Sequence, residues 1–193
     1  MLFQIYSDLH ITKNKFIPKL YKYCDYLILN GDIGKLSDIN YKKFIKYVSK
    51  TWKKIFYIPG NHEFYEKQDI YELLNKYKQF FKKFSNIVFM YNQTYELDNY
   101  LIIGTTLWSN PTKGFFENHY NERLSIKKNN KIEILGRDDY INLYKECLQF
   151  LNSIKTDKKV ILITHFPIIQ YNTINRHYSP NTDIDSYSAN KID

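Results

Sequence analysis

The sequence contains little cysteine and no long apolar run, and each absence excludes a class of protein. Cys24 and Cys147 lie far apart, each in an apolar pattern, so we expect reduced, buried thiols and no disulfide framework. The first seven residues contain no basic segment and no long apolar run, and Asp8 follows them. This pattern argues against a signal peptide or a spanning helix. We therefore expect a cytoplasmic protein with no membrane partner.

Length and charge favour a single globular domain without an obvious polyanionic partner. The 193 residues, 44% of them hydrophobic, are enough for one core that spans 1–193. A net charge of +8 would suit nucleic acid. The lysines are scattered, however, and the aromatic residues, 18% of the chain, fall mainly at expected core positions. Nucleic-acid binding is therefore possible but not indicated.

Short apolar runs alternate with helical patterns along most of the chain. Runs that are apolar on both faces are typical of strands covered on both sides. We predict such strands at 2–7, 26–30, 55–58, 87–91, 101–105 and 160–164, and helices at about 40–52, 69–83 and 139–154. This order indicates an α/β fold with a mostly parallel sheet, in which ligands bind beyond the carboxyl ends of the strands.

Two segments lack this pattern. Residues 108–137 contain Pro111, Gly136 and several Asn, and we interpret them as a long loop at the rim of the active site. Residues 171–193 are Asn-rich without periodicity, which predicts an irregular tail. Trp108 is most simply a core or loop-anchoring aromatic, and contact with a substrate is the less favoured alternative.

Polar side chains follow four of the predicted strands. Asp8 and His10 are two apart at a strand end, so on an extended chain they point the same way and can hold one ion. Asn61 and His165 offer an amide oxygen and an imidazole for a second ion, and the two oxygens of Asp32 can bridge both. Singly, each residue is readily explained as a cap, a turn residue or a core histidine. Together at strand ends they favour metal ligation, and carboxylate with imidazole suits Mn, Fe or Zn.

His62 is expected to have a different role from the ligands. Two ions about 3.5 to 4 Å apart can hold a hydroxide between them and clamp a phosphoryl group for in-line displacement. His62 follows Asn61 on the same turn, where adjacent side chains diverge, so it would reach the substrate and protonate the leaving oxygen. Gly31 and Gly60 stand before acting residues, where glycine permits a sharp turn and close approach of the backbone.

These motifs, in this order, resemble a known family. The resemblance is to the calcineurin-like metallophosphoesterases and extends from residue 1 to about 167, and the matching segments are Ser7-Asp8-Leu9-His10, Gly31-Asp32, Gly60-Asn61-His62-Glu63, Gly104-Thr105-Thr106-Leu107-Trp108 and Thr164-His165. It implies a two-sheet α/β sandwich flanked by helices. It also implies a phosphate-ester substrate, with hydrolysis of phosphomonoesters or phosphodiesters.

The sequence departs from the family in two places. Protein phosphatases of this superfamily carry an Asp three residues after the Asp of Gly-Asp, followed by Arg-Gly, whereas Lys35 stands there, which disfavours a Ser/Thr protein phosphatase. The family's last motif, Gly-His-x-His, whose histidines each ligate one ion, is absent, so the expected fold is incomplete at its C-terminus. His119 and His177 have no motif around them, and Arg176 is more simply a solvated loop charge than a phosphate ligand.

The absent motif leaves rival hypotheses open. The chain could be a truncated relative without turnover, acting as a binding module or representing a non-functional remnant, because losing one ligand per ion weakens metal affinity. A further C-terminal chain could also complete the site. A third hypothesis, a basic nucleic-acid-binding protein, predicts binding that needs no metal and depends steeply on salt.

Overall fold

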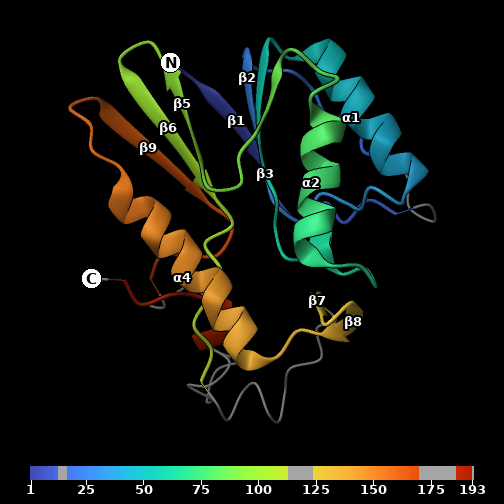
Figure 1. Ribbon diagram of the computed structural model, residues 1–193. Helices are drawn as coiled ribbons and strands as arrows, with labels where there is room; N and C mark the ends of the chain where they lie inside the picture. The colour runs from blue at the N-terminus through green and yellow to red at the C-terminus, as the bar shows by residue number, and fades with distance from the viewer. Residues whose placement is uncertain (13–16, 113–123, 170–185, 193) are drawn as a thin grey trace, which may run out of the picture.

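The computed structural model describes residues 1–12, 17–112, 124–169 and 186–192, which Figure 1 shows as ribbons. In chain order the elements are β1 (Phe3–Tyr6), β2 (Tyr26–Asn30), α1 (Ile39–Thr51), β3 (Lys54–Ile58), η1 (His62–Phe64), α2 (Ile70–Phe81), β4 (Ile87–Phe89), β5 (Gln93–Leu97), β6 (Tyr100–Thr105), β7 (Ser125–Lys128), β8 (Lys131–Ile134), α4 (Arg137–Ser153) and β9 (Lys159–Thr164). The strands and helices predicted from apolar runs and helical spacing are confirmed, and β5, β7 and β8 are additional.

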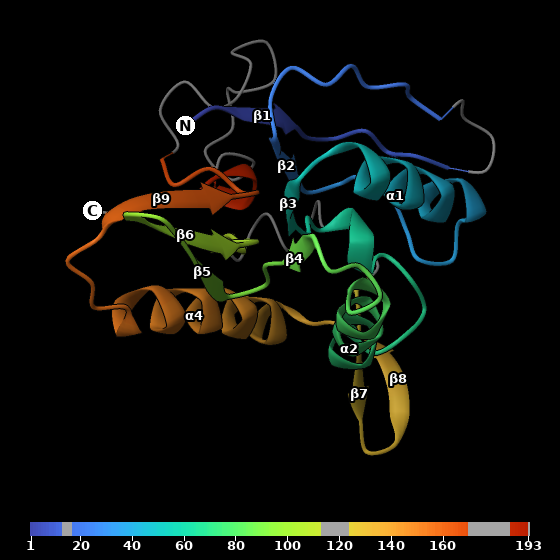
Figure 2. The same cartoon turned by 90° about the horizontal axis from the view of Figure 1, so that it is seen from above.

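Two sheets form the centre of the fold. The first has the order β1-β2-β3-β4 and is parallel throughout. The second has the order β5-β6-β9, in which β5 runs antiparallel and β9 parallel to β6. Figure 2 shows α1 and α2 on the outer side of the first sheet and α4 alongside β5 and β6. The α/β sandwich flanked by helices is therefore confirmed, and the strands are divided between two sheets.

The strands β2 and β3 are apolar on both faces because both of their faces are covered. Leu27 and Leu29 belong to the core that the helices share with the first sheet. Ile28, between them, points to the other side and packs in a second core with Phe56 and with Ile102 of the second sheet. This alternation follows from the two-residue period of a strand, and it explains why no polar residue interrupts the run.

Aspartates begin the first two helices. Asp38 accepts a hydrogen bond from the backbone N–H of Asn40 at 2.8 Å, and Asp69 accepts from those of Tyr71 and Glu72 at 3.0 and 2.9 Å. The buried faces consist of Tyr41, Phe44, Ile45 and Val48 on α1, and of Ile70, Leu73, Leu74, Tyr77 and Phe81 on α2. Many of the chain's aromatic residues are therefore core residues, as their spacing predicts.

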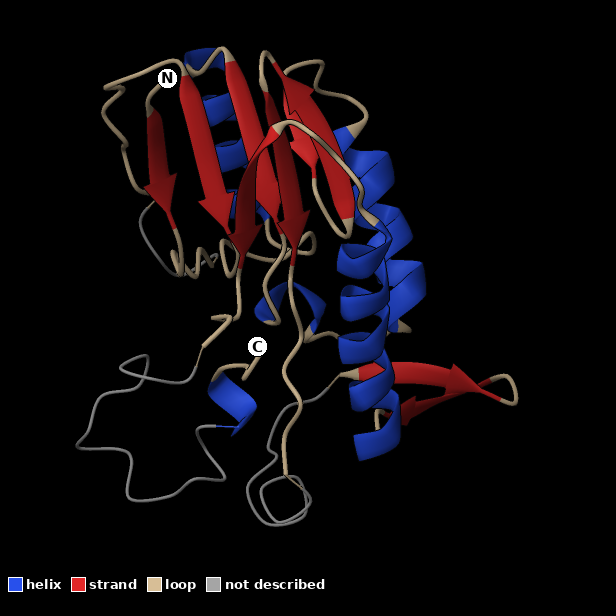
Figure 3. Ribbon diagram, turned by 90° about the vertical axis from the view of Figure 1, so that its left-hand side faces the viewer, coloured by secondary structure: helices blue, strands red, loops and turns tan. Residues whose placement is uncertain are grey.

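The prediction of a single long loop at 108–137 is wrong for part of that segment. β7 and β8 pair there as an antiparallel hairpin. Every residue of β8 is exposed although its Lys-Ile-Glu-Ile sequence alternates, and the hairpin lies apart from the two sheets (Figure 3). Trp108 is a core residue, as expected: it is 0% exposed, and its indole N–H donates to the hydroxyl of Tyr91 at 3.2 Å. Whether the segment forms a rim of the active site stays a prediction.

Part of the predicted irregular tail is docked on the domain. Residues 186–192 begin with a helical turn, and Asn190, which follows that turn, is buried. Asn190 donates through Nδ2 to the carbonyl of Leu107 at 3.0 Å and through its backbone N–H to the carbonyl of Pro167 at 2.9 Å. Hydrogen bonds to residues distant in sequence hold this segment in place, so no local periodicity in the sequence predicts it.

Of the two cysteines, Cys147 is buried as expected, whereas Cys24 is only partly buried. Cys24 and Cys147 are both free, and burial raises the pKa of the Cys147 thiol, which makes that thiol a poor nucleophile. Within the described ranges, no helix is both long and apolar enough to cross a membrane.

Replacing Gly104 by Ala should destabilise the fold by about 1–3 kcal/mol, because an overpacked core forces side chains from their preferred rotamers. The added Cβ would lie 2.4 Å from Cβ of Met90, which is fully buried between the sheets. Urea unfolding measures the effect. The control is Gly136→Ala, since a Cβ there meets only a carboxylate oxygen of Asp139 at 3.4 Å. Equal unfolding midpoints for Gly104→Ala and the unmodified chain would contradict close packing at β6.

Candidate metal centre and active site

The predicted site residues meet at one end of the sandwich. They follow the carboxyl ends of four strands: Asp8 and His10 after β1, Asp32 after β2, Asn61 and His62 after β3, and His165 after β9. We expected them on the edge of one sheet, but β9 belongs to the second sheet, so the site spans both. The side-chain amide of Asn30 donates to the carbonyl of Thr164 at 2.9 Å and joins the end of β2 to the end of β9.

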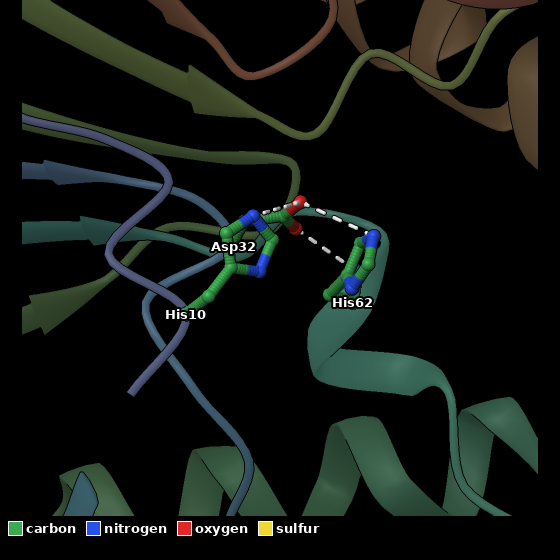
Figure 4. Close-up of side chains that lie close together, drawn as sticks. All are labelled: His10, Asp32 and His62. Atoms are coloured by element: carbon green, nitrogen blue, oxygen red, sulfur yellow. Dashed lines mark hydrogen bonds and ion pairs between the residues drawn. The ribbon is translucent and has the colours of Figure 1, made fainter. Parts of the chain in front are cut away.

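Asp32 lies at the centre of this group, and Figure 4 shows the imidazoles of His10 and His62 turned toward its carboxylate. Its Oδ2 atom is 3.9 Å from Nε2 of His10 and 3.8 Å from Nε2 of His62. Its Oδ1 atom is 3.5 Å from Nε2 of His165 and accepts the backbone N–H of His62 at 2.9 Å. One buried carboxylate therefore faces imidazoles on two sides, as a bridging ligand must.

The hydrogen bonds around His165 leave acceptor atoms facing one another. Nδ1 of His165 lies 3.0 Å from the carbonyl oxygen of Asn30, which only accepts, so Nδ1 donates there and, in the neutral imidazole, Nε2 is the acceptor. Nε2 faces Oδ1 of Asn61 at 3.1 Å. The amide nitrogen of Asn61 donates to the hydroxyl of Tyr65, which turns Oδ1 toward His165. Neither acceptor supplies a hydrogen to the other, so a cation fits the point at which they converge.

Two sets of ligand atoms share Asp32. In the first, Asp8, Asp32 and His165 offer atoms within 4.8 Å of one another, and in the second His10, Asp32 and His62 do so. Carboxylate and imidazole donors fit Mn, Fe or Zn. We expected Asp8 and His10 to share an ion, whereas the two sets separate them, although Nε2 of His10 is still 3.9 Å from Oδ1 of Asp8. His62, the predicted acid, is itself a member of the second set.

The backbone turns sharply at three of the site residues. Asp8, His10 and Asp32 have φ angles of 56°, 44° and 55°, in the left-handed region that few residues other than Gly and Asx adopt. The extended chain that we expected between Asp8 and His10 is therefore wrong. Backbone hydrogen bonds hold the turn instead, from Asp8 N–H to the carbonyl of Gly31 at 3.0 Å and from His10 N–H to the carbonyl of Asp32 at 2.9 Å.

Two glycines allow the loops to approach the ligands, as expected. Gly31 has a φ of +82°, and a Cβ added there would lie 2.2 Å from Nδ1 of His165. A Cβ added at Gly60 would lie 2.2 Å from Oδ1 of Asp32 and 2.7 Å from Nε2 of His165. Any side chain at either position would displace a ligand.

Glu63 is the functional residue to which the sequence reasoning assigned no role. It is 0% exposed and accepts five hydrogen bonds, from the backbone N–H groups of Asp32 (2.9 Å), Ile33 (2.8 Å), Gly34 (3.3 Å) and Gly60 (2.9 Å) and from the hydroxyl of Tyr57 (2.8 Å). The loop after β2 and the loop after β3 are therefore fastened to one carboxylate. The available signal was a carboxylate placed directly after His62 and before an aromatic residue.

Burial dominates the electrostatics of the site. It raises the pKa of Asp32, against the nearby His165, and it raises the pKa of Glu63, to which the carboxylate of Asp32 adds. Burial also lowers the pKa of His62, and His10 contributes to that shift. The site thus disfavours the negative charges of its own carboxylates, and a bound cation would relieve this cost.

The profile of the calcineurin-like phosphoesterase family matches residues 1–193. The chain belongs to this family. The resemblance seen in the motifs is therefore confirmed, and the family supports a phosphoesterase-type, hydrolytic function with divalent metal. The two ligand sets around Asp32 are candidates for that metal site.

Two known proteins are similar to this chain. An uncharacterized protein of Acanthamoeba polyphaga mimivirus is 36% identical over 165 residues, which are 79% of this chain and 59% of the relative. The match thus covers less than two thirds of that relative's length. The solved structure of phosphopantetheinyl hydrolase from Mycobacterium tuberculosis is similar with a TM-score of 0.62 at 14% identity, covering 98% of this chain and 75% of the other. At that identity the likeness shows the shared fold.

Several residues weighed in the sequence are not part of the described site. His119, Arg176 and His177 lie outside the described residues. Tyr65 was missed although it follows His62 by only three residues: its hydroxyl accepts from the amide of Asn61, and its ring lies 4.5 Å from that of His62.

Replacing Glu63 by Gln should unfold the site and weaken the fold. The amide turns an NH₂ group toward backbone donors, and each buried donor left without an acceptor costs about 1–3 kcal/mol. Urea unfolding and bound metal per chain measure both losses. The control is Glu96→Gln, at a side chain that is 70% exposed and pairs with Lys158, where we expect a change within about 0.5 kcal/mol. Glu63→Gln with unchanged stability and metal content would show that the loops do not depend on this carboxylate.

Proposed function

We propose that this chain hydrolyses a phosphomonoester or phosphodiester, with His62 as the acid that protonates the leaving oxygen. Asp8, His10, Asp32, Asn61 and His165 would hold two divalent ions, Mn, Fe or Zn. The observation that carries the proposal is the position of Asp32, whose two oxygens face separate imidazoles. Its burial supports the same role, because a buried carboxylate needs positive partners.

The ions and His62 have separate roles, which follow from their chemistry. When bound, the ions supply Lewis-acid polarisation of the phosphoryl group and activation of the attacking water. The bond between phosphorus and the leaving oxygen breaks, its electron pair stays on that oxygen, and the imidazolium of His62 supplies the proton. The backbone N–H of His62 is held by Asp32 at 2.9 Å, which keeps the imidazole beside the site.

The surroundings of His62 suit a proton donor. Its side chain is 45% exposed, so it is within reach of a substrate. The rings of Tyr65 and His10 lie 4.5 and 4.7 Å from its own and restrict its orientation. Burial and His10 lower its pKa in the free protein, and an incoming phosphate anion acts in the opposite direction because it favours the charged imidazolium.

A catalytically inactive relative that acts as a binding module is the alternative. The observation that favours it is the small size of the two ligand sets, each of which contains three side chains among the described residues. Additional ligands from a further segment or a separate chain would restore the first proposal. Metal content and turnover of the purified protein distinguish these cases.

Replacing Asp32 by Asn should abolish the binding of both ions, because the amide offers one neutral oxygen where the carboxylate offers two charged ones. The unmodified protein, loaded with Mn²⁺ and desalted, should hold about two ions per chain by elemental analysis, and Asp32→Asn should hold close to none. Asp157→Asn is the matched control, at an exposed position preceding β9. If Asp32→Asn retains as much metal as the control, Asp32 is not the bridging ligand.

Replacing His62 by Ala should slow hydrolysis by about 10²- to 10⁴-fold for an ester with a poor leaving group. The loss should be much smaller for p-nitrophenyl phosphate, since p-nitrophenolate leaves without a proton, than for phenyl phosphate. The measurement is kcat for both esters in both proteins, with equal metal loading verified. Equal losses on the two esters would assign His62 to metal binding or positioning and exclude it as the acid.

A further inference from the structure

A cavity of about 230 Å³ opens beside His62. Its lining comes from the loops after β1 and β2 and from the start of α1, and consists of His10, Ile11, Thr12, Gly34, Lys35, Ser37, Asp38 and His62. The volume is below the roughly 300–1,000 Å³ of pockets that enclose a drug-sized ligand, so it suits a group about as large as one ring. The lining includes the proposed acid His62 but only one of the five proposed ligands, His10. The cavity therefore lies beside the proposed metal centre.

The position of the cavity suits the leaving alcohol of the substrate. The leaving oxygen must lie next to His62 to receive a proton, and the phosphoryl group must lie toward Asp32. The remainder of the leaving alcohol then extends on the side of His62 that faces the cavity.

Lys35 is a positive charge in this lining that the proposed reaction does not use. Its ammonium donates to the backbone carbonyl of Tyr65 at 2.6 Å, and no carboxylate among the described residues forms an ion pair with it. An ammonium has three N–H donors, so the contact with Tyr65 fixes the group without exhausting it. Lys35 also lies near enough to His62 to lower the pKa of that imidazole.

Two other polar residues of the lining are already engaged. The hydroxyl of Ser37 donates to a carboxylate oxygen of Glu66 at 2.7 Å. The carboxylate of Asp38 accepts the backbone N–H of Asn40 as the cap of α1, at the positive end of the helix. Lys35 is therefore the group best placed to recognise a charge on a bound alcohol.

On these grounds, and resting on the proposed phosphoesterase activity, we propose that the cavity holds the leaving alcohol of the substrate and that Lys35 selects alcohols of about one ring that carry an anionic group. Recognition consists of a charge-assisted hydrogen bond from the ammonium to a carboxylate or phosphate on that alcohol. Lys35 thus determines specificity and takes no part in the proton transfer.

The test compares two monoesters that differ in one charge, phenyl phosphate and 4-carboxyphenyl phosphate, with the Mn²⁺-loaded protein. The readout is the ratio of their kcat/KM values, and dividing the ratio of each variant by that of the unmodified protein removes the intrinsic difference in reactivity. Lys35→Gln should lower the ratio about tenfold, and Lys35→Arg should keep most of it. The matched control is Lys46→Gln, at an exposed position on α1, which should leave the ratio unchanged.

A binding measurement on the unmodified protein complements the kinetics and does not depend on any variant folding. 4-Hydroxybenzoate, the charged product alcohol, should compete with phenyl phosphate at least several-fold better than phenol does. Equal competition by the two alcohols, or one ratio shared by the unmodified protein and Lys35→Gln, overturns the role of Lys35 while the phosphoesterase proposal stands. Failure of the metal-loaded protein to hydrolyse either ester overturns the proposed function and this inference together.

Discussion

The buried carboxylate of Glu63 accepts hydrogen bonds from two loops that follow different strands, and the arrangement of the site depends on that link. Its bonds to Asp32 N–H at 2.9 Å and Gly60 N–H at 2.9 Å fasten Asp32 to the turn that carries Asn61 and His62. A buried charge is costly unless donors surround it, and here four backbone N–H groups and one hydroxyl do so. The same bonds therefore satisfy Glu63 and position the ligands.

The second constraint is the closure of one sheet on the other. His165 reaches Asp32 only because β9 ends beside β2. There the side-chain amide of Asn30 donates to the carbonyl of Thr164, and the backbone carbonyl of Asn30 accepts from the imidazole of His165. That carbonyl decides which nitrogen of His165 faces the site. The position of His165 thus depends on how the two sheets pack, so a change in the core between the sheets would shift this candidate ligand.

Much of this arrangement was predictable from the sequence, because the relevant signals are local. Apolar runs of four to six residues followed by Asp, His or Asn reveal strand ends, and the parallel order of the strands gathers those ends at one place. Glycines at 31 and 60 indicate close approach for a reason that is also local, the absence of Cβ. All six predicted site residues consequently lie together in the structure.

Other features arise only when distant segments meet. The sequence determined the α/β fold, the strand ends and the residues that can bind metal. Tertiary structure decided which strands belong to which sheet, the left-handed turns at Asp8 and His10, the role of Glu63 and the pairing of the candidate ligands around Asp32. These depend on hydrogen bonds and burial between residues about 20 to 135 positions apart, which no local period records.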